Sequence, residues 1–448
     1  MSGFDVIILG GGPAGEHCAA RLAAGGRRVA IVERELLGGE CSYWGCIPSK
    51  TLVRPGEALQ AAREVPGARE AVAGRVDAAA AFAWRDFMVS SYDDTGQTRW
   101  ADGEGITVLR GDGRLDGPGR VRVGDTVHSA DDIVIATGSE PVIPPVPGLR
   151  ELEGIWTNRE ATGLTELPRR LLVLGGGAVG LELGQALARM GASVAMVEGA
   201  DHVLAREPKP LGDAVAEALA ADGVEMHLGR HAAAARRESR EYVLELADGT
   251  ELRGDRLLVA TGRRPRVADL GLDTLGLNGR IEIDARMRVA DGLWAIGDVT
   301  GIWPLTYVGK YQGRIAAANI LGEAREADYS AVPRVVFTDP QAAAVGETEG
   351  PLTTTVSLAE VPRTATYTRA YDAKPGFMTL VSDGECVTGA YAVGPEAGEW
   401  LQQATLAIRA RVPLTVFDDV IQPFPTFSEV FLHALQELKT KRHAGAVA

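Results

Sequence analysis

Two cysteines lie five positions apart in the stretch GGECSYWGCIPSK, which spans 38–50. Cys41 and Cys46, with Lys50 four positions beyond the second, are residue types that can carry redox, metal or thiol chemistry. A metal clip would need about four ligands. No histidine lies near either cysteine, and the other two, Cys18 and Cys386, are distant in sequence, which disfavours a metal clip. A redox pair and a pair of ordinary core thiols both remain open at this point.

Ahead of the cysteines, FDVIILGGGPAGEHCAARLAAGGRRVAIVE has the pattern of a nucleotide-binding unit. The apolar run at 6–9 predicts a buried strand that enters glycines at 10, 12 and 15 in a G-x-G-x-x-G frame. An alanine-rich helix and a second strand follow, and that strand ends at Glu33. Such glycines permit close approach to a pyrophosphate, the helix N-terminus offers N–H groups, and the acid accepts from ribose hydroxyls.

The same pattern returns in RRLLVLGGGAVGLELGQALARMGASVAMVE, with glycines at 175, 177 and 180 and an acid at Glu198. In both copies the acid lies 18 residues beyond the third glycine (33 − 15 and 198 − 180). Two copies in one register predict that the chain binds two dinucleotides. Glu198 favours NADH over NADPH because a carboxylate repels a 2′-phosphate, although nearby Arg206 could soften that preference.

The composition excludes several classes of partner. The 448 residues are too many for one core, so two to four domains are expected. A net charge of −14 argues against nucleic acid and anionic membranes as partners. No apolar run reaches transmembrane length, and MSGFDVIILGGG lacks the basic start of a signal peptide. We therefore expect a cytoplasmic protein whose four cysteines form no disulfide scaffold.

The remaining pattern gives a coarse organisation. Residues 52–100 predict helices, and 106–135 alternate like a small antiparallel sheet. The segment IATGSEPVIPPVPG, with four prolines, predicts irregular structure at a domain boundary. Residues 293–301 predict a strand that ends in a Gly-Asp turn, and a third unit of strands and helices begins near 330.

Six motifs resemble those of the flavoprotein disulfide reductases, the family that includes dihydrolipoamide dehydrogenase, glutathione reductase and mercuric reductase. In order, they are GGGPAG, GGECSYWGCIPSK, ATGSEPVIPPVPG, GGGAVGLELG, AIGDV and VVFTDPQAAAVG. The resemblance covers essentially the whole chain and implies an α/β fold with two Rossmann-like domains, for FAD and NAD, and a C-terminal α+β dimerisation domain. The expected segments are an FAD-binding domain at 1–148, an NAD(P)-binding domain at 149–264, a return to the FAD-binding domain at 265–329 and a dimerisation domain at 330–448.

The resemblance also assigns cofactor residues by position. Asp298 would bind the ribityl chain of FAD. Lys50 and Glu182 correspond to an ion pair beside the flavin, where a lysine stabilises negative charge on the reduced ring. From the residues alone, Glu182 would be a helix-surface glutamate. The expected cofactor-binding residues are Gly10, Gly12, Pro13, Ala14, Gly15, Glu33, Lys50, Ala136, Thr137, Gly138, Gly175, Gly177, Gly180, Glu198, Gly262, Gly297 and Asp298.

For the cysteines, the resemblance implies a redox disulfide in which Cys46 exchanges electrons with the flavin and Cys41 attacks the substrate. A four-residue spacer can be closed within a distorted helical turn. The following IPSK predicts a helix whose N-terminus, with Lys50 near, favours thiolate. Tyr43 and Trp44 replace smaller residues of the relatives. They either pack against the flavin domain or shape the approach of a flat substrate.

The C-terminal motif departs from the family. Relatives supply a base from the partner subunit in the form His-x-His-Pro-Thr-x-x-Glu, whereas this chain reads QPFPTFSE. Phe424 takes the place of the catalytic histidine and Gln422 that of the earlier one, while Glu429 is retained. Phenylalanine cannot move a proton, and loss of such a group costs about 10²–10⁴ in rate. We therefore expect a poor lipoamide or glutathione reductase.

Three interpretations accommodate this departure. The substrate needs no proton from the enzyme, as with a metal ion, a quinone or a disulfide with acidic thiols. Alternatively His433 or Tyr307 stands in for the histidine, or disulfide exchange is lost and flavin chemistry retained. The mercuric reductase branch also carries an aromatic residue here, but this chain ends KTKRHAGAVA, without the terminal cysteine pair of that branch.

The leading prediction is a homodimeric FAD-dependent enzyme that takes hydride from NADH, or from NADPH, and reduces a specialised disulfide or another thiol-reactive small molecule. One alternative is a quinone or metal-ion reductase, and another is a flavin-bound electron-transfer subunit of a larger complex. No resident metal is expected. The predicted catalytic set is Cys41, Cys46, Lys50, Glu182, Phe424 and Glu429.

Overall fold

The computed structural model describes residues 3–361 and 376–447, and the chain divides into two compact units. Helices α3 (Cys46–Glu64) and α4 (Ala78–Met88) each begin in one unit and end in the other. The first unit comprises 1–48, 83–142 and 262–328, and the second comprises 49–82, 143–261 and 329–448.

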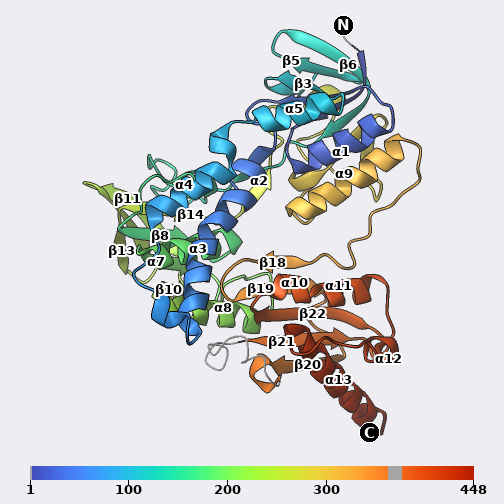
Figure 1. Ribbon diagram of the computed structural model, residues 1–448. Helices are drawn as coiled ribbons and strands as arrows, with labels where there is room; N and C mark the ends of the chain where they lie inside the picture. Colours follow the sequence, from blue (N-terminus) through green and yellow to red (C-terminus); the bar gives the residue numbers. More distant parts are fainter. Residues whose placement is uncertain (1–2, 362–375, 448) are drawn as a thin grey trace. The chain divides into compact units, whose positions relative to one another are not determined.

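The first unit is built on a mixed sheet with the strand order β16-β17-β6-β1-β2-β3, to which β4 and β5 attach beside β6. The strands from β17 to β3 run parallel, and β16 runs antiparallel to β17. In β1, residues 6–9 are almost fully buried, as expected for a parallel strand covered on both faces. Helices α1 and α9 lie side by side (Figure 1).

The strands of the first unit are β1 (Gly3–Leu9), β2 (Val29–Glu33), β3 (Thr107–Arg110), β4 (Gly113–Leu115), β5 (Arg120–Val123), β6 (Thr126–Ile135), β7 (Ser139–Pro141), β15 (Arg263–Pro265), β16 (Arg288–Ala290) and β17 (Leu293–Ala295). Its α-helices are α1 (Pro13–Ala24), α2 (Gly39–Tyr43), α5 (Thr95–Gly103) and α9 (Thr306–Ile320), and its 3-10 helices are Ser90–Tyr92, Leu272–Leu275 and Gly297–Thr300.

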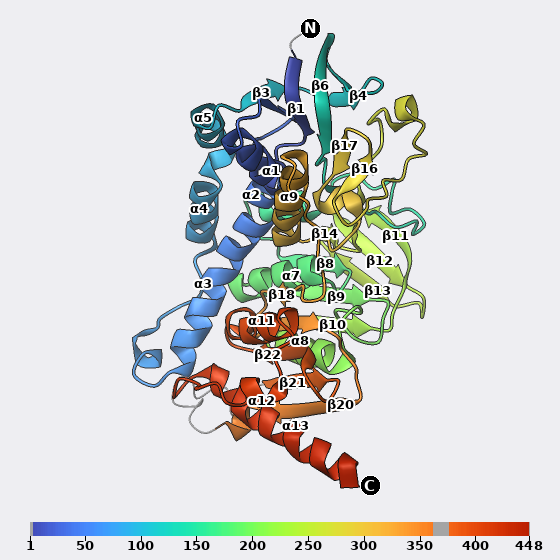
Figure 2. The same cartoon turned by 90° about the vertical axis from the view of Figure 1, so that its right-hand side faces the viewer.

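The described residues of the second unit form three sheets, whose positions can be followed in Figure 2. A parallel sheet has the order β10-β9-β8-β14, and an antiparallel sheet has the order β11-β12-β13. The third sheet is antiparallel, with the order β18-β19-β22-β21-β20, and α13 packs beside β20 and β21. Phe431, Leu435 and Leu438 of α13 are buried in this core.

The strands of the second unit are β8 (Arg170–Leu174), β9 (Ser193–Glu198), β10 (Glu225–Leu228), β11 (Ala232–Glu238), β12 (Glu241–Leu246), β13 (Glu251–Gly254), β14 (Arg256–Val259), β18 (Arg334–Val336), β19 (Gln341–Gly346), β20 (Leu352–Ser357), β21 (Phe377–Ser382) and β22 (Val387–Gly394). Its α-helices are α6 (Asn158–Thr162), α7 (Ala178–Met190), α8 (Lys209–Ala221), α10 (Ala397–Trp400), α11 (Gln402–Arg409), α12 (Leu414–Phe417) and α13 (Val430–Val447), and its 3-10 helices are Arg69–Ala71, Leu358–Glu360 and Phe427–Glu429.

Two local predictions need correction. Within 106–135, β4, β5 and the first part of β6 are antiparallel, but β3 and the end of β6 belong to the parallel sheet. The reason is that 133–135 are buried and apolar, which suits a central parallel strand. Residues 139–141, predicted to be irregular, form β7 and pair with β15, because proline is tolerated in a short edge strand.

The other local predictions are confirmed. Helices α3, α4 and α5 occupy much of 52–100, and β17 leads into the 3-10 helix Gly297–Thr300 at the Gly-Asp turn. The fold class, with two Rossmann-like units and a further α+β region, is confirmed by the strand orders. The division at 148, 264 and 329 stays a prediction.

Candidate active site

The first glycine turn joins β1 to α1. Gly10 has φ = +110°, a value that favours glycine, and a Cβ there would lie 2.3 Å from the Ala136 carbonyl oxygen. A Cβ at Gly15 would lie 2.1 Å from the Gly10 carbonyl oxygen. By contrast, a Cβ at Gly12 would meet no described atom within 4 Å. Gly10 and Gly15 are therefore required by packing, and Gly12 faces open space that fits a pyrophosphate.

The second turn, between β8 and α7, repeats this geometry. Gly175 has φ = +114°, and a Cβ there would lie 2.5 Å from the Ala260 carbonyl oxygen. A Cβ at Gly180 would lie 2.2 Å from the Gly175 carbonyl oxygen, whereas one at Gly177 would meet no described atom within 4 Å. The residues present thus fit a second dinucleotide.

The two acids are held in the same way. One oxygen of Glu33 accepts from the Gly11 N–H at 2.8 Å, and one oxygen of Glu198 accepts from the Gly176 N–H at 2.7 Å. In each case the other oxygen accepts from the N–H two residues further on, at 2.8 Å. A carboxylate has about four acceptor sites, so each acid can fix the backbone of its turn and still accept hydrogen bonds from ribose hydroxyls.

Residues of α1 and of the Gly-Asp turn are packed together in the first unit. Pro13 is at the start of α1, where a missing N–H costs nothing. A Cβ at Gly297 would come within 3.2 Å of the Ala14 Cβ, so the turn approaches α1 closely. The Gly297 N–H donates to the buried Gln312 side chain at 2.6 Å. These contacts fix the turn that carries Asp298.

Asp298 is oriented by two residues that sequence reasoning missed. The Ser139 hydroxyl donates to an Asp298 carboxylate oxygen at 2.6 Å, and Arg263 Nε donates to the same hydroxyl at 2.7 Å. Arg263 also lies 3.6 Å from the Glu40 carboxylate. Ser139 and Arg263 belong to the repeated phrases ATGSEP and ATGRRP, and that echo was the signal that could have found them.

The remaining predicted residues lie in these two phrases. The Thr137 hydroxyl donates to the Arg266 carbonyl oxygen at 2.7 Å. Gly138 and Gly262 have φ = +74° and +126°, and a Cβ at either would meet no described atom within 4 Å. Their binding of a cofactor stays a prediction.

The cysteines lie at a break between two helices. Cys41 is on α2, and Cys46 is the first residue of α3, so the predicted helix after the pair is confirmed. Both cysteines are thiols in the structure, and the two are hydrogen-bonded to each other. Cys46 Sγ lies 3.3 Å from the hydroxyl of Thr306, the first residue of α9. Thr306 was missed by sequence reasoning, which considered the adjacent Tyr307.

The surroundings of Cys41 act against a thiolate, and the expected thiolate character of the pair stays a prediction. Its hydrogen bond with Cys46 and, next, its burial raise the pKa of the Cys41 thiol well above the usual value. The hydrogen bond from Thr306 acts in the opposite direction but is a smaller effect. Its hydrogen bond with Cys46 and its burial thus favour the protonated form of Cys41 in the folded chain.

Tyr43 has a packing role. Its ring is 1% exposed, and its hydroxyl donates to the Leu37 carbonyl oxygen at 3.1 Å. The ring centroid lies 5.7 Å from that of Trp44, and Trp44 also contacts Tyr92, at 6.1 Å. Of the two interpretations for Tyr43, packing within the unit fits the structure.

Lys50 and Glu182 form an ion pair in the second unit, with 2.7 Å between Lys50 Nζ and a Glu182 oxygen. The Glu182 side chain is 5% exposed, so it is a buried residue of α7 and not a surface glutamate. Its second oxygen accepts from the Phe337 N–H at 3.0 Å. The contact between Lys50 and Glu182 agrees with the family's ion pair, and its role in catalysis stays a prediction.

The C-terminal motif carries an unsatisfied acceptor. Phe424 is 58% exposed, and Gln422 exchanges two hydrogen bonds with Gln403, of 3.0 and 2.9 Å. Glu429 Oε2 is buried and has no hydrogen-bond partner within 3–361 and 376–442. His433 lies on α13, one helical turn beyond Glu429. The glutamate is thus retained in a place where nothing described donates to that oxygen.

The described part of the chain holds no group of three or more histidine, cysteine, aspartate or glutamate side chains placed to bind a metal ion. Among the helices described, none is both long and apolar enough to cross a bilayer.

Comparison with known proteins decides the family. Residues 4–313 match the pyridine nucleotide-disulphide oxidoreductase family, and 332–435 match the dimerisation domain of the same family. The chain belongs to this family. Its members are flavoprotein oxidoreductases that depend on FAD and use NAD(P)H, so the predicted enzyme class and cofactors are confirmed.

Similar members of the family differ in their named substrates. The chain is 34% identical to a dihydrolipoyl dehydrogenase of Thermus scotoductus over 98% of both chains. It is 35% identical to a mercuric reductase of Acidithiobacillus ferrooxidans over 95% of this chain and 81% of that one. A solved Cu(II) complex of the HOCl-induced flavoprotein disulfide reductase RclA from Escherichia coli has a TM-score of 0.86 and 28% identity, covering 98% of this chain and 100% of that one.

Proposed function

We propose that this family member is a homodimer that takes hydride from NADH and delivers electrons through Cys41 and Cys46 to a thiol-reactive acceptor that needs no enzymatic base. The observation that supports the proposal is the hydrogen bond between the thiols of Cys41, on α2, and Cys46, the first residue of α3, whose Sγ lies 3.3 Å from the Thr306 hydroxyl. When bound, FAD supplies transfer of two electrons between NADH and the cysteine pair.

Several residues of the chain have separate roles in the proposed reaction. Glu33 and Glu198 brace the turns that would receive the two nucleotides. Lys50, one helical turn after Cys46 on α3, holds a positive charge next to Glu182. With a disulfide acceptor, the Cys41 sulfur bonds to one acceptor sulfur and the acceptor's S–S bond breaks. Cys46 then displaces the second sulfur, so two thiols leave with the two protons of the pair and the Cys41–Cys46 disulfide forms.

The acceptor must be able to react with a Cys41 that is protonated. The raised pKa of Cys41 makes its thiolate scarce, and by the family resemblance Phe424 takes the place expected for a base. An ordinary disulfide would therefore react slowly. An acceptor with acidic leaving thiols, or one that displaces the thiol proton on binding, avoids this barrier.

A soft metal ion is the second candidate acceptor. A similar enzyme is a mercuric reductase, and a similar solved structure is a Cu(II) complex. Thiols that coordinate such an ion lose their protons outright, which removes the need for a base. Two protons would be released on binding, and two electrons from NADH would then reduce the ion. Here the ion is a substrate and not a resident cofactor.

An anaerobic NADH titration of the purified FAD-loaded protein tests the cysteine route. We expect one equivalent of NADH to produce a long-wavelength absorption band from a Cys46 thiolate to the flavin while the flavin stays oxidised, because Cys46 is the cysteine assigned to exchange electrons with the flavin. Bleaching of the flavin without that band would show that the cysteine pair does not exchange electrons with the flavin. The search for an acceptor would then turn to quinones and protein partners.

Replacement of Cys46 by serine tests the cysteine route by mutation. In Cys46→Ser we expect NADH-dependent turnover of disulfides and soft metal ions to be lost, because the variant has no second sulfur to form the disulfide or to bind the ion together with Cys41. Quinone reduction should persist, since it can draw on the flavin directly. Steady-state assays with the three acceptor classes measure this. Cys386→Ser, which changes a buried thiol that donates to the Arg411 carbonyl oxygen, is the matched control.

A further inference from the structure

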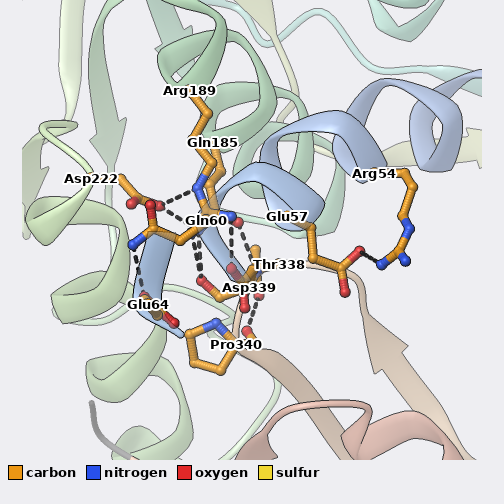
Figure 3. Close-up of polar contacts among 10 residues, drawn as sticks. All are labelled: Arg54, Glu57, Gln60, Glu64, Gln185, Arg189, Asp222, Thr338, Asp339 and Pro340. Atoms are coloured by element: carbon orange, nitrogen blue, oxygen red, sulfur yellow. Dashed lines mark hydrogen bonds and ion pairs between the residues drawn. The ribbon is translucent and has the colours of Figure 1, made fainter. Parts of the chain in front are cut away.

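One row of side chains on α7 holds the segment 337–339, which joins β18 to β19. Glu182, Gln185 and Arg189 recur at spacings of three and four, so they share one face of α7. Gln185 accepts from the Asp339 N–H and donates to the Asp339 carbonyl oxygen, both at 2.8 Å. Arg189 binds the Asp339 carboxylate at 2.7 Å and the Asp222 carboxylate at 2.8 Å (Figure 3).

The same segment carries Phe337, which contacts both members of the Lys50–Glu182 pair. Its N–H donates to one Glu182 oxygen at 3.0 Å, and the other oxygen accepts from Lys50 Nζ at 2.7 Å. Its ring lies under the ammonium, with Lys50 Nζ 4.6 Å from the ring centroid. Lys50 also donates to the Ser49 hydroxyl at 3.3 Å.

These contacts constrain an otherwise flexible group. A lysine ammonium is a compact charge on a four-carbon stem, so a single carboxylate partner leaves its position poorly defined. An aromatic face attracts a cation from a fixed direction and cannot accept its proton. Because α7 clamps Asp339, the ring two residues earlier is held against the same helix that carries Glu182.

We infer that Phe337 is a positioning residue for the Lys50 ammonium. Its backbone N–H orients the Glu182 carboxylate, and its ring face sets where the charge of Lys50 lies. The inference rests on the proposed function, in which the Lys50 charge acts on the reduced flavin. In this assignment Phe337 acts through Lys50 and Glu182.

A first experiment asks whether the ring holds the ammonium. The chain has six lysines, so reductive ¹³C-methylation of the FAD-loaded protein gives a simple NMR spectrum in which charge is retained. The Lys50 signal, assigned by its loss in Lys50→Arg, should lie upfield because of the ring current of Phe337. Phe337→Leu should remove that displacement, and Phe337→Tyr should keep it.

Phe377→Leu is the matched control, because Phe377 is another half-buried phenylalanine of the same unit and packs against Tyr391 at 6.1 Å. It should leave the Lys50 signal in place. An unchanged Lys50 signal in Phe337→Leu would overturn the inference.

A second experiment measures the consequence for the flavin. The ratio of reduced to oxidised flavin is read at equilibrium with a reference dye, a readout that needs no acceptor turnover. Lys50→Met should lower this ratio, and Phe337→Leu should lower it in the same direction by about threefold, with Phe337→Tyr close to wild type. If Lys50→Met shifts the ratio and Phe337→Leu does not, Phe337 does not position the Lys50 charge. If Lys50→Met itself has no effect, the proposed role of Lys50 fails instead.

Discussion

At the residue scale, the family resemblance predicts a catalytic histidine at the position of Phe424, five residues before Glu429. Here Glu429 Oε2 is buried with no hydrogen-bond partner in the described part of the chain, and Phe424 is 58% exposed. A buried acceptor without a donor has a free-energy cost of about 1–3 kcal/mol, so a restored donor would be stabilised there.

Restoration of the histidine is therefore a direct test at the residue scale. In Phe424→His we expect turnover of ordinary disulfides such as lipoamide to rise by about 10²-fold, because a base becomes available to Cys41. Steady-state assays measure the gain. Phe424→Leu, which removes the ring without supplying a base, should show none. Equal rates in the two variants would mean that Glu429 cannot orient the new side chain.

At the scale of elements, the first turn of α1 contains a carboxyl group whose burial dominates its titration. Burial, aided by the nearby Glu33 charge and opposed by Lys310, raises the pKa of Glu16 from 4.5 to about 7. A helix N-terminus normally favours the charged form, so desolvation outweighs the helix dipole here. The folded protein thus binds a proton at Glu16 that the unfolded chain releases between about pH 4.5 and 7.

The sign of the pH dependence follows from this excess proton. Because the folded state binds more protons in that window, the free energy of unfolding falls as the pH rises from about 4.5 to 7. Glu16→Gln should therefore raise the thermal midpoint at pH 8 and change it little at pH 5. Calorimetry at both pH values measures the difference. Glu323→Gln, which removes an exposed partner of Arg21 on α1, should not show this difference between the two pH values. Equal shifts at both pH values would contradict burial as the cause.

At the scale of the whole molecule, the region matched to the dimerisation domain exposes many apolar side chains. Ile421 is 93% exposed and Leu406 is 69% exposed, and Val416 and Phe424 are more than half exposed. Exposed apolar groups gathered in one region mark association surfaces, and a two-fold pairing would bury them. This is the support for the homodimer in the proposed function.

A charge placed on that surface tests the assembly. Ile421→Glu should convert the dimer to a monomer at micromolar concentration, because an unpaired carboxylate would be buried on pairing. Sedimentation velocity measures the distribution. Ala247→Glu, on the exposed turn between β12 and β13, adds the same charge elsewhere and should leave the dimer intact. A monomeric wild-type chain would contradict the homodimer of the proposed function.

The sequence by itself determined the features that depend on neighbours along the chain. Both glycine turns, their acids at matched spacing and the helix that begins at Cys46 follow from local sterics, because contacts within a β-α-β unit recur wherever the pattern recurs. Only the tertiary structure decided contacts between distant residues. Lys50 meets Glu182 across 132 positions, and Cys46 meets Thr306 across 260. After its hydrogen bond with Cys46, the raised pKa of Cys41 likewise depends on burial, which no spacing encodes because it arises when separate elements pack and exclude water.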